Sequence, residues 1–178
     1  MSRLFVAVDL PEGVKDLLVG VREAIPGARW VPREQLHLTL RFIGDTQEPL
    51  VSRVREVLAE VRSAPFTLTL AGTGHFPPRR DPRVLWVGLH PSPPLLELQR
   101  QVETALQRAG IPAEGRPFSP HLTLARLKES SIIAVADFEK KNGTLLSEPF
   151  AVDGFHLYAS TLTPSGAVHR RVRSYPLG

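Results

Sequence analysis

The tetrapeptide His-Leu-Thr-Leu occurs twice in this sequence, at residues 37–40 and again at residues 121–124. From residue 37 to residue 121 the separation is 84 residues, close to half of the 178-residue chain. A repeat of this length indicates two similar lobes that face each other, and it argues against a solenoid of short units. No other feature of the sequence constrains the fold as strongly.

The pattern of apolar residues predicts the same order of elements in both halves of the chain. In the first half, about residues 1–76, it predicts strands at 3–10, 36–43 and 66–70 and helices at 11–25 and 49–62. In the second half, about residues 84–178, it predicts strands at 84–89, 122–127, 150–160 and 168–175 and helices at 94–109 and 131–141. We therefore expect one α+β domain with two lobes related by a pseudo-two-fold, in which two antiparallel sheets line a central cleft and the helices lie outside.

Glycines and tryptophans lead to two further expectations about these elements. Gly72 and Gly74 predict the end of the strand at 66–70, because glycine weakens a strand interior. Trp30 and Trp86 stand in apolar segments, and we expect both to be core residues.

The composition narrows the class of protein. The absence of cysteine excludes a disulfide scaffold, a thiolate zinc site and a cysteine nucleophile. No apolar run approaches the ~20 residues that span a bilayer, and the first residues do not form a secretory signal, so we expect a cytoplasmic protein without membrane contact. The net charge of +4 favours a polyanionic partner such as nucleic acid, although a general preference for arginine on the surface explains it almost as well.

Strand alternation places the polar residues of each tetrapeptide together. Side chains of a strand alternate between its faces, so His37 and Thr39 point to one side and the leucines between and after them to the other. The same holds for His121 and Thr123. If the two lobes face each other, the two His–Thr pairs meet across one cleft.

Two histidines and two threonines suit phosphoryl chemistry. Histidine has an unperturbed pKa of about 6.5, so one ring can accept a proton from water while the other donates one to a leaving oxygen. Threonine hydroxyls can donate hydrogen bonds to phosphate oxygens. A zinc site is the other chemical reading, but neither tetrapeptide carries a second ligand at the required spacing, so we expect no metal.

The segments around the two motifs resemble a known family. They are RLFVAVDLP, RWVPREQLHLTLRFIGD, PRVLWVGL and RPFSPHLTLAR, and the resemblance as a whole runs from about Arg3 to Pro176. In this order they resemble the two-histidine (2H) phosphoesterases, and among these the bacterial and archaeal RNA 2′,3′-cyclic phosphodiesterases, earlier named 2′-5′ RNA ligases.

The resemblance implies an activity and roles for the motif residues. It implies hydrolysis of an RNA-terminal 2′,3′-cyclic phosphate to a 2′-phosphate, with His37 as proton donor, His121 as proton acceptor, and Thr39 and Thr123 bound to the phosphate. It implies no cofactor, and a 2′-5′ ligation that needs no ATP, consistent with the lack of a GxxxxGK[ST] loop in the sequence. The expected partners are RNA ends with a cyclic phosphate, such as those of tRNA fragments, and we expect a monomer.

Three further residues are candidate substrate contacts. The resemblance points to Arg126, although alternation from His121 places it on the leucine face unless the strand bulges or ends. Alternation places Arg41 on the same face as His37 and Thr39, within reach of a phosphate. Phe118 precedes the second motif and is a candidate for stacking on a base, although packing within its own lobe is the commoner fate of such a residue.

The remaining histidines and a basic segment receive weaker interpretations. We interpret His75, His90, His156 and His169 as structural or surface residues, since none has a threonine two positions on. His75 is the one candidate among them for the border of the cleft, because it ends a predicted strand. Arg79, Arg80 and Arg83 belong to an exposed connection that either meets RNA phosphates or is simply solvated.

Two other functions remain open from the sequence. One is a phosphodiesterase of small cyclic nucleotides. A comparison of catalytic efficiency on mononucleotide and oligonucleotide substrates would distinguish it from an enzyme that acts on RNA ends. The other is an RNA-binding module without turnover, in which RNA binding survives replacement of both histidines.

Overall fold

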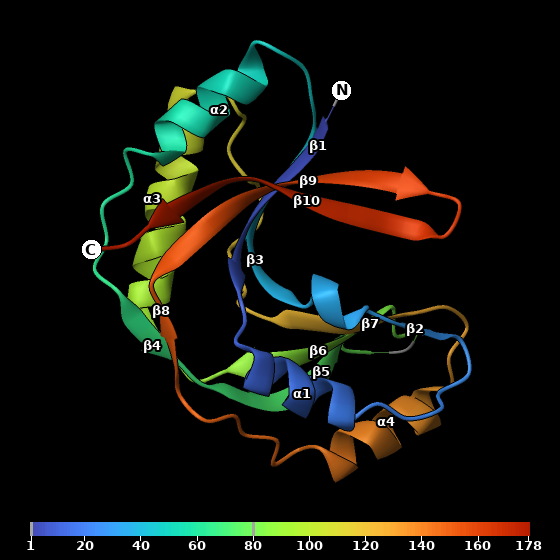
Figure 1. Cartoon of the computed structure of the whole chain (residues 1–178). Helices are drawn as coiled ribbons and strands as arrows, with labels where there is room; N and C mark the ends of the chain where they lie inside the picture. Colours follow the sequence, from blue (N-terminus) through green and yellow to red (C-terminus); the bar gives the residue numbers. More distant parts are fainter. Residues whose placement is uncertain (1, 80) are drawn as a thin grey trace.

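The α-helices follow the apolar periodicity of the sequence, and two of them begin at a capping serine. A computed structural model describes residues 2–79 and 81–178 (Figure 1). Its helices are α1 (Glu12–Gly20), α2 (Leu50–Leu58), α3 (Pro93–Arg108) and α4 (Ile132–Lys141), with a 3-10 turn η1 (Arg33–Gln35). The Ser92 hydroxyl accepts a hydrogen bond from the Leu95 amide at the start of α3, and Ser131 caps α4 in the same way.

Two helices end earlier than their apolar patterns predict: α2 ends at Leu58 and not near residue 62, and α1 is shortened further. The periodicity extends to Ile25, but α1 ends at Gly20. Ile25 is nevertheless buried, at 6% exposure, because the irregular segment after α1 also packs against the core. Burial, and not helical structure, explains the apolar residue at this position.

The strands form two four-stranded antiparallel sheets. Sheet A has the order β10-β9-β1-β3, and sheet B has the order β2-β7-β6-β5. A two-stranded sheet of β4 and β8 joins them at one side (Figure 1). The strand bounds are β1 (Ser2–Asp9), β2 (Ala28–Trp30), β3 (His37–Thr46), β4 (Phe66–Leu68), β5 (Leu70–Phe76), β6 (Val84–Leu89), β7 (Leu122–Leu127), β8 (Phe150–Val152), β9 (Gly154–Thr163) and β10 (Gly166–Pro176).

The two sequence halves exchange strands, so the halves are not the lobes. In sheet A the first-half strands β1 and β3 are extended by β9 and β10 from the second half. In sheet B the second-half strands β6 and β7 are extended by β5 and β2 from the first half. The orders β3-β1-β9 and β7-β6-β5 correspond, which gives the fold its pseudo-two-fold character.

The layers agree with the predicted α+β architecture. Figure 1 shows α2 and α3 beside sheet A and α1 and α4 beside sheet B, with both sheets between these helices. The leucines of both motifs point toward the helices and are buried, with at most 2% exposure for Leu38, Leu40, Leu122 and Leu124. We call the helix-free side of each sheet its inner face.

Strand β5 continues through the glycines that were expected to end it. It extends to Phe76, and a Cβ on Gly74 would lie 2.3 Å from Cζ2 of Trp86. Glycine is therefore required here because the Trp86 ring lies across the backbone. Trp86 pairs with Thr123, so it belongs to the inner face of sheet B and not to the core, which corrects the expectation.

Two other differences concern short strands. The predicted strand at 150–160 is divided at Asp153, because β8 pairs with β4 while β9 joins sheet A. Strand β2 was not predicted, since three residues give too short a pattern. Across residues 2–79 and 81–178, no helix has the length and apolar character to span a membrane.

Candidate active site

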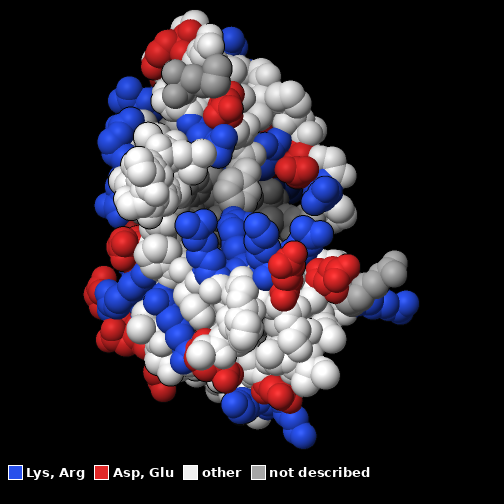
Figure 2. All heavy atoms as spheres, turned by 90° about the vertical axis from the view of Figure 1, so that its right-hand side faces the viewer, with Lys and Arg blue, Asp and Glu red and all other residues white. Residues whose placement is uncertain are grey.

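The two His–Thr pairs lie on the inner faces of strands that approach each other. His37 and Thr39 are partly exposed on β3, between buried leucines, and His121 and Thr123 stand in the same way at the start of β7. Strands β3 and β7 belong to different sheets and lie against each other. Figure 2 shows a hollow on the face of the molecule that lies to the right in Figure 1.

His37 is surrounded by aromatic rings. Its imidazole stacks on Phe5, with ring centroids 5.0 Å apart, and meets the edge of His169 at 5.7 Å. His169 comes from β10, at the opposite edge of sheet A from β3, so the twist of the sheet brings its two edge strands together. Burial, and then the charge of His169, lower the pKa of His37 to about 4. His37 is therefore neutral near pH 7 in the free protein.

His121 has a more open environment. Its Nδ1 donates a hydrogen bond to the Ser119 carbonyl at 2.8 Å, and its ring meets Phe76 edge-on at a centroid distance of 5.0 Å. Because a carbonyl oxygen only accepts, Nδ1 carries the hydrogen and Nε2 of the neutral ring is left to accept a proton. The carbonyl of Gln35, also two residues before its histidine, interacts with His37 and opposes the decrease in its pKa.

Both motif strands contain a bulge at the same position. In β3, Thr39 pairs with Ala7 but Arg41 pairs with Val6, which leaves Leu40 without a direct partner. In β7, Thr123 pairs with Trp86 and Ala125 pairs with Leu85, which leaves Leu124 unpaired in the same way. A bulge inserts one residue and reverses the alternation beyond it.

The bulge in β3 corrects the expectation for Arg41. The side chain lies on the helix side of sheet A, is 8% exposed, and does not share the inner face with His37. Its Nε donates to Glu103 of α3 at 2.7 Å, and the guanidinium also donates to the carbonyls of Phe42 and Pro112. Arg41 is a buried structural residue, and Phe42 takes its place on the inner face, with 60% exposure.

The bulge in β7 has the opposite consequence for Arg126, since it moves this residue from the helix side to the inner face. Ala125 is buried on the helix side, and Arg126 is exposed on the inner face with His121 and Thr123. Simple alternation placed Arg126 on the leucine face unless the strand bulged or ended. The strand does bulge. Arg126 therefore occupies in β7 the position that Phe42 occupies in β3.

Comparisons with known proteins identify the family. The sequence pattern of the 2′-5′ RNA ligase superfamily matches residues 12–163. The chain belongs to this superfamily. It is 32% identical to a protein named RNA 2′,3′-cyclic phosphodiesterase from Archaeoglobus fulgidus, over 97% of this chain and 99% of that one. A Thermotoga maritima protein of the same name is 34% identical, with 94% and 91% covered.

Solved structures of the superfamily share the whole fold. TT0787 of Thermus thermophilus superposes with a TM-score of 0.82 at 31% identity, covering 98% of this chain and 97% of that one. LigT of Escherichia coli, solved in complex with 3′-AMP, gives a TM-score of 0.80 at 27% identity, with 99% and 98% covered. The resemblance inferred from the motif segments is confirmed, and so is the 2H phosphoesterase fold.

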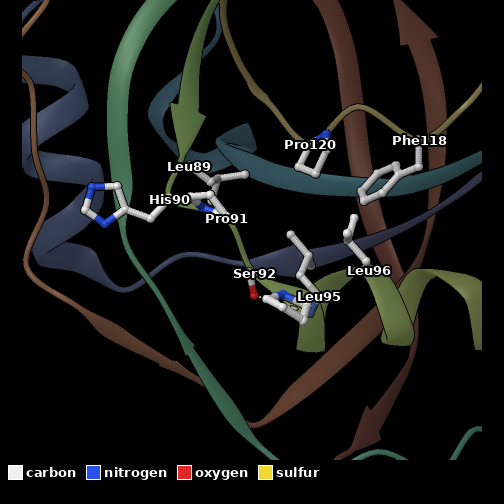
Figure 3. Close-up of a pocket in the computed structure, with 9 residues that line it drawn as sticks. Leu89, His90, Pro91, Ser92, Leu95, Leu96, Phe118 and Pro120 are labelled. Carbon is white, nitrogen blue, oxygen red and sulfur yellow. Dashed lines mark hydrogen bonds between the residues drawn. The ribbon is translucent and has the colours of Figure 1, made fainter.

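The candidate contact Phe118 lies beside a groove next to the second motif. It lines an apolar groove of about 360 Å³ between the start of α3 and the segment before β7. In Figure 3 its ring lies beside Leu96, with Pro120 and Leu89 along the same groove. Phe118 also packs against the core, which is the alternative to base stacking that the sequence allowed.

The other histidines have contacts that the sequence did not reveal. His75 does not border the inner face, because its Nδ1 lies 2.5 Å from Glu139 of α4 on the helix side. His156 hydrogen-bonds Ser174 on the inner face of sheet A, and His169 meets His37. His90 is exposed, as expected.

A second polar cluster lies on the inner face of sheet A. Asp9 accepts a hydrogen bond from the Tyr158 hydroxyl at 2.5 Å, pairs with Arg171, and lies 3.4 Å from Nε2 of His156. Burial raises the pKa of Tyr158 and lowers that of His156. Because Asp9 is directly opposite His37 in the β1–β3 pair, this cluster holds the edge of the site in place.

The described part of the chain forms no cluster of metal ligands. Within residues 2–79 and 81–178, no three His, Asp or Glu side chains come together in a metal-binding arrangement. In the basic connection, Arg79 and Arg83 are exposed, and Arg80 lies outside the described residues. The polar groups of the inner faces therefore include the two His–Thr pairs, Arg126 and the cluster around Asp9.

Proposed function

We propose that the protein hydrolyses RNA-terminal 2′,3′-cyclic phosphates to 2′-phosphates by metal-independent acid–base catalysis with two histidines. The observation that carries the proposal is the repeated His–Thr pair, presented on the inner faces of two strands that lie against each other. The curated relatives named RNA 2′,3′-cyclic phosphodiesterase support the same reaction. The protein acts on RNA ends such as those of tRNA fragments, as a monomer.

The reaction needs two proton transfers on opposite sides of phosphorus. Nε2 of His121 accepts a proton from water as the water oxygen forms a bond to phosphorus. The bond from phosphorus to the 3′ oxygen breaks, and His37 donates a proton to that oxygen. The product carries the phosphate on the 2′ oxygen.

The assignment of His37 as donor requires that substrate binding changes its charge. Its pKa of about 4 keeps it neutral in the free protein near pH 7. An opposite charge nearby favours the protonated ring, so the anionic cyclic phosphate raises the pKa of His37 as it binds. His37 therefore takes up its proton with the substrate and delivers it to the leaving oxygen.

Neighbouring side chains bind the phosphate and the nucleoside. The hydroxyls of Thr39 and Thr123 donate to the non-bridging oxygens, and the guanidinium of Arg126 stabilises the negative charge that grows on them. The exposed ring of Phe42 offers a surface for a nucleobase, since unstacked RNA bases bind to aromatic rings. With a 5′-hydroxyl in place of water, the same steps give a 2′-5′ linkage without ATP.

The direct test uses EDTA-treated protein and an RNA oligonucleotide that ends in a 2′,3′-cyclic phosphate. We expect a 2′-phosphate product, and no reaction with a DNA 3′-phosphate, which lacks the 2′ oxygen. A 3′-phosphate product would reverse the assignment of the leaving oxygen, and absence of any product would refute the proposal. Higher efficiency on cyclic mononucleotides than on oligonucleotides would favour the small-substrate alternative.

A further inference from the structure

Arg29 and Arg126 stand directly opposite each other in neighbouring strands. They are register partners in the antiparallel pair of β2 and β7. Both are exposed, and register partners share a face, so Arg29 is on the inner face with Arg126. The next residue, Trp30, confirms this placement from the other side, because its ring packs on Phe138 of α4. No pattern in the sequence distinguishes Arg29 from other arginines.

Two like charges at this spacing oppose strand pairing unless an anion binds them. Side chains directly opposite in an antiparallel pair interact, and like charges there are destabilising. Six of the described arginines pair with carboxylates, namely Arg3, Arg33, Arg41, Arg100, Arg108 and Arg171, and Arg29 and Arg126 belong to the group that does not. Within residues 2–79 and 81–178, neither Arg29 nor Arg126 has a carboxylate partner. Figure 2 shows Lys and Arg side chains gathered along one edge of the hollow.

The position of β2 determines which of the two arginines lies nearer to the His–Thr pairs. Arg126 is on the same strand as Thr123, three residues beyond it, and His121 directly precedes this strand. Arg29 is one strand farther out, on the edge strand of sheet B, about 4.8 Å away. A chain that extends from the His–Thr pairs over Arg126 therefore reaches Arg29 next and then leaves the sheet.

We propose that Arg29 binds the phosphodiester on the 5′ side of the terminal nucleotide, next to the cyclic phosphate at Arg126. This inference rests on the proposed function and specifies its substrate as an RNA chain. A cyclic mononucleotide has no such phosphodiester, so Arg29 contributes only to the binding of oligonucleotides. The contact is electrostatic and independent of base sequence.

The test compares two substrates in wild type and Arg29→Gln. One substrate is 2′,3′-cyclic CMP, and the other is an oligonucleotide of ten nucleotides that ends in the same cyclic nucleotide. We expect kcat/KM for the oligonucleotide to fall about tenfold at low salt, as loss of one charged phosphate contact implies. The value for cyclic CMP should change by less than about twofold, since an exposed side chain without a partner is replaced.

Salt dependence supplies a second measurement. Loss of one phosphate contact should reduce the slope of log kcat/KM against log salt by about 0.7 for the oligonucleotide. Arg29→Lys keeps the charge and should restore most of the efficiency and the slope. Arg53→Gln, an exposed arginine on the outer helix α2, is the matched control and should change neither.

The outcomes separate this inference from the proposed function. An equal decrease for both substrates would place Arg29 at the reacting phosphate, and no decrease for either would exclude a contact; both results overturn the proposal. Binding of a fluorescent oligonucleotide with a 2′-phosphate end, measured by anisotropy, tests Arg29 without turnover. If wild type hydrolyses neither substrate, the proposed function fails, and unchanged binding in Arg29→Gln would then refute the role of Arg29 separately.

Discussion

The two copies of one tetrapeptide occupy different environments. In sheet A, His37 lies against Phe5 and His169, and burial lowers its pKa to about 4. In sheet B, His121 has Phe76 at its edge and a hydrogen bond that fixes the proton on Nδ1. The strand positions correspond, so the difference arises from the residues that each sheet gathers around its histidine. Pseudo-symmetry places a histidine at the corresponding position of each sheet, and the surroundings of His37 then lower its pKa.

The comparison predicts that neither histidine can replace the other. His37→Gln and His121→Gln should each lower kcat by about 10²- to 10⁴-fold, because each removes one proton transfer. His90→Gln, an exposed histidine away from both motifs, is the control. The measurement is turnover of a cyclic-phosphate RNA, with thermal melting to show that the variants fold. A variant that retains wild-type kcat would mean that its histidine takes no part in proton transfer.

The residues at the bulges provide the next comparison. Arg41→Met leaves Glu103 without its partner beneath sheet A and should lower the free energy of unfolding by about 3–5 kcal/mol. Arg126→Gln changes an exposed residue, so its stability should change by less than about 0.5 kcal/mol. Its kcat should instead fall about 10²-fold, since a donor to the reacting phosphate is lost. Urea unfolding and turnover measure the two effects.

A matched control tests whether burial explains the stability effect. Arg108→Met breaks a pair with Glu60 in which both side chains are more than half exposed. Its cost should lie below about 1 kcal/mol, as for surface ion pairs in general. Equal costs for Arg41→Met and Arg108→Met would contradict the structural role assigned to Arg41.

The low pKa of His37 predicts a pH-dependent stability. In the unfolded chain its pKa is about 6.5, and in the folded protein it is about 4, so protons favour the unfolded state. The contribution is complete above pH 6.5 and is lost as the pH falls toward 4, a change of up to about 3 kcal/mol. Urea unfolding between pH 7 and pH 4 measures it. His37→Gln should lose this part of the pH dependence, and an identical dependence in both proteins would contradict the prediction.

Local alternation was sufficient to predict part of this site. It placed the histidines, threonines and leucines of both motifs correctly, because no bulge interrupts the strand before Leu40 or Leu124. It misplaced Arg41, and it left Arg126 undecided, because the bulge depends on pairing with β1 and β6. The sequence of one strand does not show where its partner skips a residue.

The rest of the fold depends on contacts between distant segments. The strand after the glycines at 72 and 74 was missed because the reason for Gly74 is the ring of Trp86 on the next strand. The exchange of strands between lobes was missed because each half predicts its own sheet equally well. His169 was interpreted as a surface or structural residue, since only the twist of sheet A brings β10 to His37.

The smallest predicted effect tests whether this twist helps to distinguish the two histidines. The charge of His169 is the second cause of the low pKa of His37, after burial. His169→Gln removes that charge but keeps a side chain of similar length, so the pKa of His37 should rise. An NMR titration of the imidazole resonances measures it. A pKa of His37 that is unchanged or lower in the variant would mean that burial alone lowers it, and that the contact between His37 and His169 has no electrostatic role.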